Sequence, residues 1–285
     1  MTRFLFWNLH RADATAEPKR AAAICASLAR LVRDRGIDIL IFAEYELADT
    51  QVKTALDASG VGVFHRPASR SERIVIWTRW PVGRVVDRYG GWATTKMTIR
   101  QLVPSNGIPA HLVAAHLRDR TTLTTEAGRG HAASEVSAAI RRFESFNGNG
   151  RTILVGDLNL NPFEFGAVGP ACFHAMMTTE LARSVQGLAA RSDYSTFYNP
   201  MWGLFGDRTK GPPGTYFWRN SEEATNHFWH MYDQVLIRPD LIDSFRGVEI
   251  VAGDGTESFV TDSGRPRPDH YSDHLPLLFE IDFTR

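Results

Sequence analysis

Short runs of apolar residues recur along the chain, and a polar side chain stands at or just beyond the end of many of them. Runs at 2–7, 37–43, 110–115 and 152–155 are apolar almost throughout, which is typical of strands buried on both faces. These four runs lead into Asn8, Glu44, His116 and Asp157. The pattern predicts a β-rich core with polar groups where its strands end.

A different periodicity predicts two substantial helices, at 18–35 and 126–146. In the first, Ile24, Leu28 and Leu31 form one apolar stripe, Pro18 suits the first turn, and Gly36 follows the last. Shorter helices are expected at 51–58 and 173–185, and mostly loop at 192–230. Further strands are predicted at 61–64, 74–77, 82–86, 96–103, 234–237, 245–251 and 275–283.

These elements alternate too irregularly for repeated βαβ units. Two stacked mixed sheets with helices outside them would bury this many apolar strands. No internal repeat or linker interrupts the chain, so we expect residues 1–285 to form one domain.

Composition indicates the cellular location of the protein more clearly than its function. No apolar run reaches the roughly 18–20 residues of a membrane span, and the first residues lack a signal-peptide layout. Two cysteines are too few for a disulfide framework, so a cytoplasmic setting is expected. The formal net charge is zero, which gives no support to tight sequence-independent binding of nucleic acid but allows a local basic rim. No feature indicates an obligate protein partner.

The segment 155–162, Val-Gly-Asp-Leu-Asn-Leu-Asn-Pro, carries the strongest candidate chemistry. Asp157 and Asn159 are two apart, so in extended backbone they face the same side. A carboxylate beside an amide suits a hard cation such as magnesium, or a water held next to a phosphate. The alternative is a simple turn, because both side chains often bond local backbone.

Three further polar groups adjoin apolar strands. Asp233 precedes the strand at 234–237, and Asp273 with His274 precedes the last strand. Acid, amide and imidazole groups without a cysteine cluster indicate an oxygen-preferring ion at one rim of the sheets. We expect His10, two residues after Asn8, to stay outside this rim.

Six short motifs occur in a fixed order: Trp7-Asn8-Leu9, Phe42-Ala43-Glu44, Ala115-His116-Leu117, Gly156-Asp157-Leu158-Asn159, Tyr232-Asp233-Gln234 and Ser272-Asp273-His274-Leu275-Pro276. In this order the chain resembles the endonuclease/exonuclease/phosphatase superfamily, over residues 7–276. The resemblance implies an α/β fold, a four-layer sandwich of two packed mixed β-sheets flanked by helices. It also implies metal-dependent cleavage of a phosphoester, with magnesium or manganese as cofactor.

The resemblance also implies a role for each matching residue. Glu44 would be the main metal ligand, although Glu46 is a competing carboxylate, and Asn8 and Asp273 would help to hold metal or phosphate. Asp157 would orient or deprotonate the attacking water, which Asn159 would position. His274 would bond the scissile phosphate, Asp233 would fix the tautomer of His274, and His116 would donate to the phosphate or the leaving oxygen.

The substrate remains open at this stage. A nuclease acting on DNA or RNA is favoured, and the arginines at 66, 70, 73, 118, 120 and 129 could contact backbone phosphates. Arg73, Arg118 and Trp218 are the residues we select as substrate-binding candidates. Aromatic residues between Tyr194 and Tyr232 could stack on bases, or could instead pack the loop onto the sheet. A small or lipid phosphoester, and a binding module without catalysis, are the alternatives.

Overall fold

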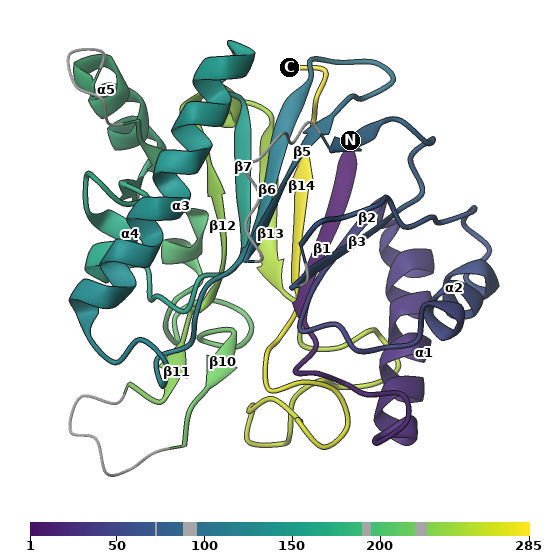
Figure 1. The fold of residues 1–285 in the computed structure, drawn as a ribbon. Coiled ribbons are helices and arrows are strands. Elements are labelled where there is room, and N and C mark those ends of the chain that lie inside the picture. Colours follow the sequence, from purple (N-terminus) through teal and green to yellow (C-terminus); the bar gives the residue numbers. More distant parts are fainter. Residues whose placement is uncertain (72, 88–95, 190–194, 220–226) are drawn as a thin grey trace.

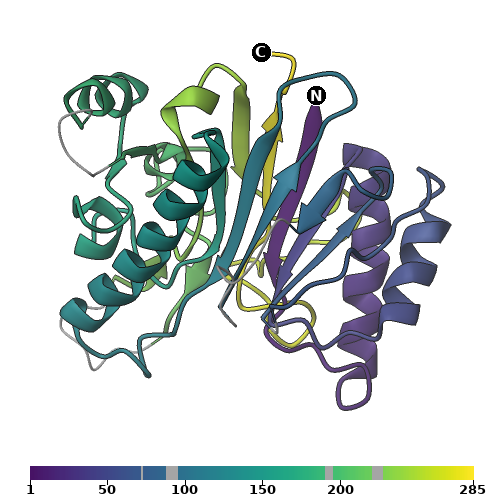
Figure 2. The same cartoon turned by 45° about the horizontal axis from the view of Figure 1, so that its top comes forward.

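The computed structural model describes residues 1–71, 73–87, 96–189, 195–219 and 227–285. It has two mixed sheets packed face to face, with helices covering both outer faces, as expected from the sequence (Figure 1). Figure 2 shows the same four layers with the top of the molecule turned forward.

The first sheet has five strands in the order β13-β14-β1-β2-β3. Their bounds are Phe245–Ile250, Leu277–Ile281, Thr2–Asn8, Ile39–Ala43 and Ile74–Thr78. β1 pairs parallel with β2 and antiparallel with β14. The first strand and the last one therefore lie side by side at the centre of this sheet.

The second sheet has seven strands in the order β4-β5-β6-β7-β12-β9-β8. Their bounds are Val85–Asp87, Met97–Leu102, Ala110–His116, Thr152–Asp157, Asp233–Ile237, Phe197–Tyr198 and Ala175–Met176. β6 and β7 are parallel, whereas β12 runs antiparallel to β7. A separate two-stranded hairpin pairs β10 (Tyr216–Phe217) with β11 (Trp229–His230).

Helices α1 (Pro18–Arg35) and α2 (Asp49–Ala58) cover the first sheet, on the right in Figure 1. Helices α3 (Glu126–Asn147), α4 (Phe165–Val168) and α5 (Thr179–Ala189) lie on the side of the second sheet. Two 3-10 turns, η1 (Pro200–Gly203) and η2 (Pro239–Leu241), complete the regular structure of the described residues.

Side-chain alternation along β1 shows why the layers pack. Phe4 and Phe6 belong to the apolar cluster between the two sheets, whereas Leu5 and Trp7 belong to the cluster beneath α1 and α2. Phe4 stacks on Phe279 of β14, with ring centroids 4.7 Å apart. Each central strand is thus buried on both faces, which explains its nearly continuous apolar sequence.

One of the predicted elements was wrong, and another has different bounds. Residues 61–64 form no strand: Gly60 and Gly62 both have positive φ, and Val63 is 73 % exposed. The predicted helix at 173–185 begins only at Thr179, because Ala175 and Met176 pair with β9. The expected loop at 192–230 is mostly irregular where it is described; 192–194 and 220–226, and with them Tyr194, lie outside the described residues.

Gly156 makes the close approach of β6 and β7 possible. It pairs with Ala115, and a Cβ built at Gly156 would lie only 1.8 Å from the carbonyl oxygen of Ala115. We expect Gly156→Ala to lower the free energy of unfolding by at least about 2 kcal/mol, since overpacking of this kind forces backbone shifts. Urea denaturation would measure the change.

Gly247→Ala is the matched control, because Gly247 also lies in a strand but has nothing within 4 Å of its built Cβ. We expect this variant to change stability by less than about 0.5 kcal/mol. Equal effects of the two substitutions would contradict the interpretation of Gly156.

Candidate active site

Strand register brings the polar strand ends to one end of the molecule. His116 and Asp233 are both register partners of Asp157 in the second sheet, on its two sides. In the first sheet, Asn8 is the partner of Ala43, and Glu44 follows directly. The six segments predicted from the sequence to meet therefore do so at the same end of the two sheets.

Two hydrogen bonds join this cluster across the gap between the sheets. The amide of Asn8 donates from Nδ2 to Oδ2 of Asp157 over 3.0 Å. Nδ1 of His274 lies 2.8 Å from Oδ2 of Asp233. Asn8 ends β1 of the first sheet and His274 lies in the segment leading into β14 of that sheet, whereas Asp157 and Asp233 belong to strands of the second sheet. All four residues are buried. The cluster is thus fixed by the packing of the two sheets.

The backbone around His274 is held by residues from the motifs at 7–9 and 272–276. Trp7 donates from Nε1 to the carbonyl oxygen of His274 over 3.0 Å. The hydroxyl of Ser272 donates to the carbonyl oxygen of Asn8 over 2.7 Å and accepts the N–H of His274 over 3.1 Å. The first and last motifs therefore form one hydrogen-bonded unit.

His116 lies between two carboxylates. Its Nε2 is 3.5 Å from Oε1 of Glu44 and 3.7 Å from Oδ2 of Asp157. Burial, helped by the positive charge of Arg73, lowers the pKa of His116 from its ordinary 6.5 to about 4. With this pKa, His116 is a neutral imidazole at pH 7 and lies between Glu44 and Asp157.

Asp157 and His274 shift in the same direction for different reasons. Burial, together with the negative charge of Asp233, raises the pKa of Asp157, against the opposing effect of His274. Burial alone would lower the pKa of His274, but the neighbouring carboxylates, chiefly Asp233, outweigh it and raise that pKa. An acid with a raised pKa therefore faces a cationic imidazole, with Nε2 of His274 3.9 Å from Oδ2 of Asp157.

Asn159 is built into the wall of the site. Its backbone N–H bonds Oδ1 of Asp157 over 3.0 Å, and its Nδ2 donates to the carbonyl oxygen of Leu117 over 3.1 Å. Asn159 and Glu44 both have left-handed backbones, with φ of 50° and 48°. This conformation is uncommon for residues other than glycine, and it turns the chain sharply just after β7 and β2.

His10 reaches the rim, and the expectation that it stays outside was wrong. Its Nδ1 is 3.2 Å from Oδ1 of Asp273, while its backbone N–H bonds Oδ1 of Asn8. Arg11 lies 3.8 Å from Glu44 and 4.0 Å from Glu46. Both His10 and Arg11 have positive φ, so a tight turn after β1 directs them back over the site.

The carboxylates fit a divalent cation. Side chains of Glu44 and Asp273 are 24 % and 23 % exposed, so they are open to a hydrated ion, and their ligand atoms are oxygens. Ligand atoms of Asp157, Asp233 and His274 also lie within 4.8 Å of one another. However, Asp233 and His274 already bond each other, which leaves Glu44 and Asp273 as better candidates for holding the ion.

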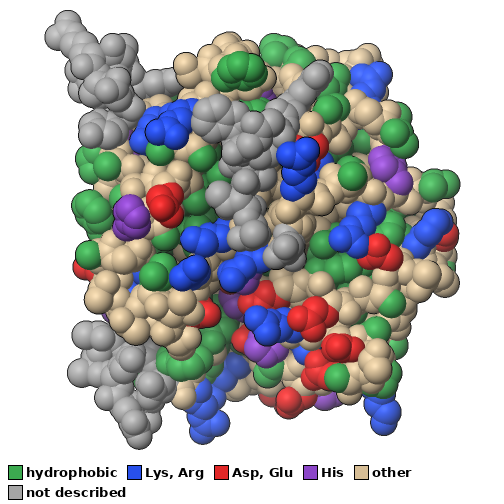
Figure 3. All heavy atoms as spheres, viewed as in Figure 1, with side chains coloured by type: hydrophobic (Ala, Val, Ile, Leu, Met, Phe, Trp, Pro, Cys, Tyr) green, Lys and Arg blue, Asp and Glu red, His purple; other side chains and the backbone are tan. Residues whose placement is uncertain are grey.

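The predicted basic residues have different environments. Arg66 forms an ion pair with Asp49, and both Arg120 and Arg129 pair with Glu164, so these three arginines are engaged within the protein. Arg118 is exposed and Arg73 is half-buried. Figure 3 shows basic side chains beside acidic and histidine side chains near the middle of one face.

Trp218 is 40 % exposed, in the segment that follows β10. Its ring stacks on that of Tyr216, with centroids 6.3 Å apart, and Tyr216 in turn contacts the ring of His274. The structure thus connects Trp218 to the cluster through one aromatic residue. Sequence reasoning identified neither Tyr216 nor the preceding Thr215 as a neighbour of His274, because they lie in a segment without periodicity.

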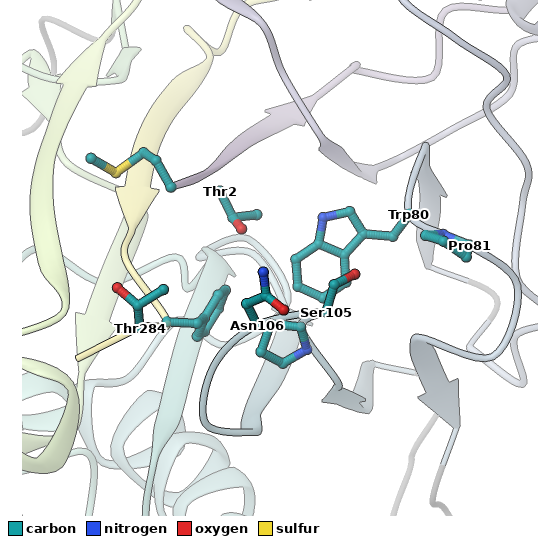
Figure 4. A pocket seen from close by; sticks show the side chains of 9 residues that line it. Thr2, Trp80, Pro81, Ser105, Asn106 and Thr284 are labelled. Carbon is teal, nitrogen blue, oxygen red and sulfur yellow. The ribbon is translucent and has the colours of Figure 1, made fainter.

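A hollow of about 160 Å³ lies at the other end of β1, beside Thr2, Trp80 and Asn106 (Figure 4). Its lining includes no acidic, basic or histidine side chain among the described residues. β1 separates it from the cluster at Asn8 by the length of the strand, so it takes no part in the polar site. Within the described part of the chain, no helix is long and apolar enough to cross a membrane.

Comparison with known protein families identifies the family of this chain. The sequence profile of the Endonuclease/Exonuclease/phosphatase family matches residues 5–274, and the chain belongs to that family. Membership supports hydrolysis of a phosphoester as its activity. No match was found among curated proteins.

Solved structures share the fold at low sequence identity. The catalytic domain of human Nocturnin with bound sulfate has 19 % identity and a TM-score of 0.57, covering 99 % of this chain and 93 % of that one. D. rerio TDP2 complexed with a single-strand DNA product has 16 % identity and a TM-score of 0.55, covering 99 % and 98 %. A variant of the 3′ phosphatase NExo from Neisseria, bound to product DNA hairpin, has 15 % identity and a TM-score of 0.51, covering 99 % and 100 %.

The lowered pKa of His116 gives a direct test of the site's electrostatics. In the metal-free protein, we expect His116 to stay neutral until the pH falls to about 4. Because the unfolded chain takes up this proton near pH 6.5, His116 contributes stability above that pH that is lost progressively as the pH falls towards 4. Imidazole ¹⁵N shifts measured against pH, assigned with His116→Gln, would report the titration. A midpoint near the ordinary value of 6.5 would contradict this expectation.

Proposed function

We propose that residues 1–285 form one catalytic domain that hydrolyses phosphodiester bonds of DNA or RNA with the help of a divalent metal ion. The observation that carries this proposal is the pair of cross-sheet contacts, Asn8 with Asp157 and Asp233 with His274. They place an acid with a raised pKa beside a cationic imidazole at a partly open rim. Water activation on one side and charge stabilisation on the other are what phosphodiester hydrolysis requires.

Asp157 acts on the attacking water in this proposal. A raised pKa brings a carboxylate closer to the operating pH, which favours proton transfer from water. The side-chain amide of Asn8 donates a hydrogen bond to Oδ2 of Asp157, and the backbone N–H of Asn159 donates one to Oδ1. In this structure Oδ1 of Asn8 accepts the N–H of His10, so we assign Asn8 mainly to the positioning of Asp157.

His274 and His116 act on the phosphate. Asp233 holds Nδ1 of His274, which leaves Nε2 to donate to a phosphate oxygen and offset its charge. His116 is neutral, so the N–H of its imidazole can donate a hydrogen bond to a phosphate oxygen or to the leaving oxygen.

Glu44 and Asp273 would hold the metal ion, magnesium or manganese. Glu44 lies 3.8 Å from the exposed side chain of Arg11, and Asp273 lies 3.2 Å from the exposed side chain of His10, so a bound ion could displace either contact. A bound divalent ion would supply charge that offsets the negative charge developing on the phosphate oxygens.

Three residues near the site suit a polymeric substrate. Arg73 and Arg118 would contact backbone phosphates next to the scissile one, and Trp218 would stack on an unpaired base. The DNA complexes of the TDP2 and NExo structures, which share this fold, support nucleic acid over a small ester.

Removing either central group should abolish cleavage while the fold is retained. We expect His274→Ala and Asp157→Asn each to lower kcat by roughly 10³-fold on plasmid DNA, single-stranded DNA or RNA, since each removes a charge-stabilising donor or a base. His131→Ala is the matched control, because His131 lies exposed on α3 and should leave kcat unchanged. Full activity of both site variants would overturn the proposal.

Metal binding can be tested without measuring activity. Calorimetric titration of the metal-free protein with Mg²⁺ or Mn²⁺ should show binding that Glu44→Gln weakens at least roughly 10-fold, because one anionic oxygen ligand is lost. Glu46→Gln is the control, since Glu46 is more exposed and lies 4.0 Å from Arg11. A chelator should also abolish cleavage. Equal affinity of both variants would remove Glu44 from the metal site.

The substrate-binding residues predict effects on KM. Trp218→Ala should raise KM for single-stranded substrate roughly 10-fold, because stacking on one base contributes about 1–3 kcal/mol. Phe146→Ala, at an exposed aromatic residue of α3, should have no effect.

Arg118→Ala should raise KM most at low salt, whereas Arg246→Ala, on β13, should not. An unchanged KM in both site variants would favour a smaller substrate.

A further inference from the structure

One dipeptide at the start of the hairpin contacts both members of the Asp233–His274 pair. Thr215 Oγ1 accepts the backbone N–H of Asp233 over 3.1 Å. The carbonyl oxygen of Thr215 accepts the N–H of Leu275 over 2.8 Å, and Tyr216 forms a β-bridge with His274. Thr215 and Tyr216 therefore tie a strand of the second sheet to the segment leading into β14 of the first.

The side chain of Tyr216 lies against the imidazole itself. The two ring centroids are 4.6 Å apart, with an angle of 37° between the planes. Tyr216 also stacks on Tyr232, at 5.3 Å and 25°, and Tyr232 stacks on His230, at 4.6 Å and 19°. The contact with His274 is thus the end of a continuous series of ring contacts.

This series is anchored at its far end. Nδ1 of His230 lies 3.0 Å from Nδ2 of Asn161, whose Oδ1 accepts the backbone N–H of Met231. Asn161 also bonds Glu164, which pairs with Arg120. The rings that support Tyr216 are therefore fixed by buried polar contacts, and Tyr216 has little freedom to move away from His274.

The bond to Asp233 does not by itself fix the imidazole. The hydrogen bond at Nδ1 restrains the tilt of the ring only as closely as hydrogen-bond geometry requires, and that geometry tolerates a range of angles. The χ2 angle of histidine has a broad preference, so rotamer energy does not supply the missing restraint. The ring of Tyr216, packed against the face of the imidazole, supplies this restraint and thereby sets the direction of Nε2.

We propose that Tyr216 is a positioning residue for His274, acting through the packing of its ring against the imidazole rather than through its hydroxyl group. This inference rests on the proposed function, because it assigns Tyr216 to the orientation of the histidine that contacts the phosphate. The phenol need not touch the substrate for this role.

Two predictions distinguish ring from hydroxyl. Tyr216→Leu removes the ring and should lower kcat roughly 10-fold or more with a smaller change in KM, since a displacement of about 1 Å in a catalytic group can cost roughly 100-fold. Tyr216→Phe keeps the ring and should retain nearly full kcat. Phe217→Leu is the matched control from the same short strand, because the Phe217 ring contacts Phe228, Trp229 and Arg265 instead.

The test that needs no substrate is NMR of the metal-free protein. Wild type should show nuclear Overhauser effects between the ring protons of Tyr216 and those of His274. The downfield Nδ1 proton of His274, bonded to Asp233, should shift or broaden by exchange in Tyr216→Leu and keep its position in Tyr216→Phe and Phe217→Leu. Thermal unfolding measured in parallel separates a local change at His274 from a general loss of folding.

Each outcome decides between the alternatives. Absence of the ring–ring effects in wild type overturns the proposal even if no Tyr216 variant folds. Equal losses in Tyr216→Phe and Tyr216→Leu assign the effect to the hydroxyl and also overturn it. If His274→Ala keeps full activity while the NMR contacts are present, the proposed function fails and the stacking geometry stands, so the two failures are distinguishable.

Discussion

Contact across the gap between the two sheets is the constraint on which the rest of this structure depends. Asn8 of the first sheet bonds Asp157 of the second, and Asp233 of the second sheet bonds His274, in the segment that leads into β14 of the first. Their side chains meet only if the apolar layer between the sheets, which includes Phe4 and Phe279, has the right thickness. Because interiors of proteins are close-packed, that thickness is set within narrow limits by side-chain volume. The apolar core therefore determines the geometry of the polar site.

The sequence predicted the layers, and which residues lie together at the rim, because one signal governs both. An apolar run predicts a buried strand, and a polar residue at its end predicts a side chain at the rim of the sheet. Asn8, His116 and Asp157 all follow this pattern. The register of parallel β6 and β7, and of β1 with β2, then makes neighbours of residues that no sequence window connects. The pairing of Asp233 with His274 was expected from the family resemblance rather than from the strand pattern.

What the sequence did not predict depends on contacts without periodicity. Tyr216 belongs to a strand of only two residues, and its partner His274 is far along the chain. His10 reaches Asp273 because the backbone after β1 has positive φ, which local composition does not indicate. For the predicted strand at 61–64, the local composition was misleading. Its residues suit a strand, but Gly60 and Gly62 have positive φ, and the segment pairs with no described strand, so Val63 is exposed.

The left-handed backbones of Glu44 and Asn159 set a limit on improving this protein. Each is a non-glycine residue in a conformation that glycine would adopt without steric cost, and such strain is typical of functional positions. A glycine at either position would relieve that strain and remove the polar side chain in the same step. Selection for thermal stability alone would therefore favour loss of the site, so any library screened for robustness has to keep these two positions under a functional selection as well.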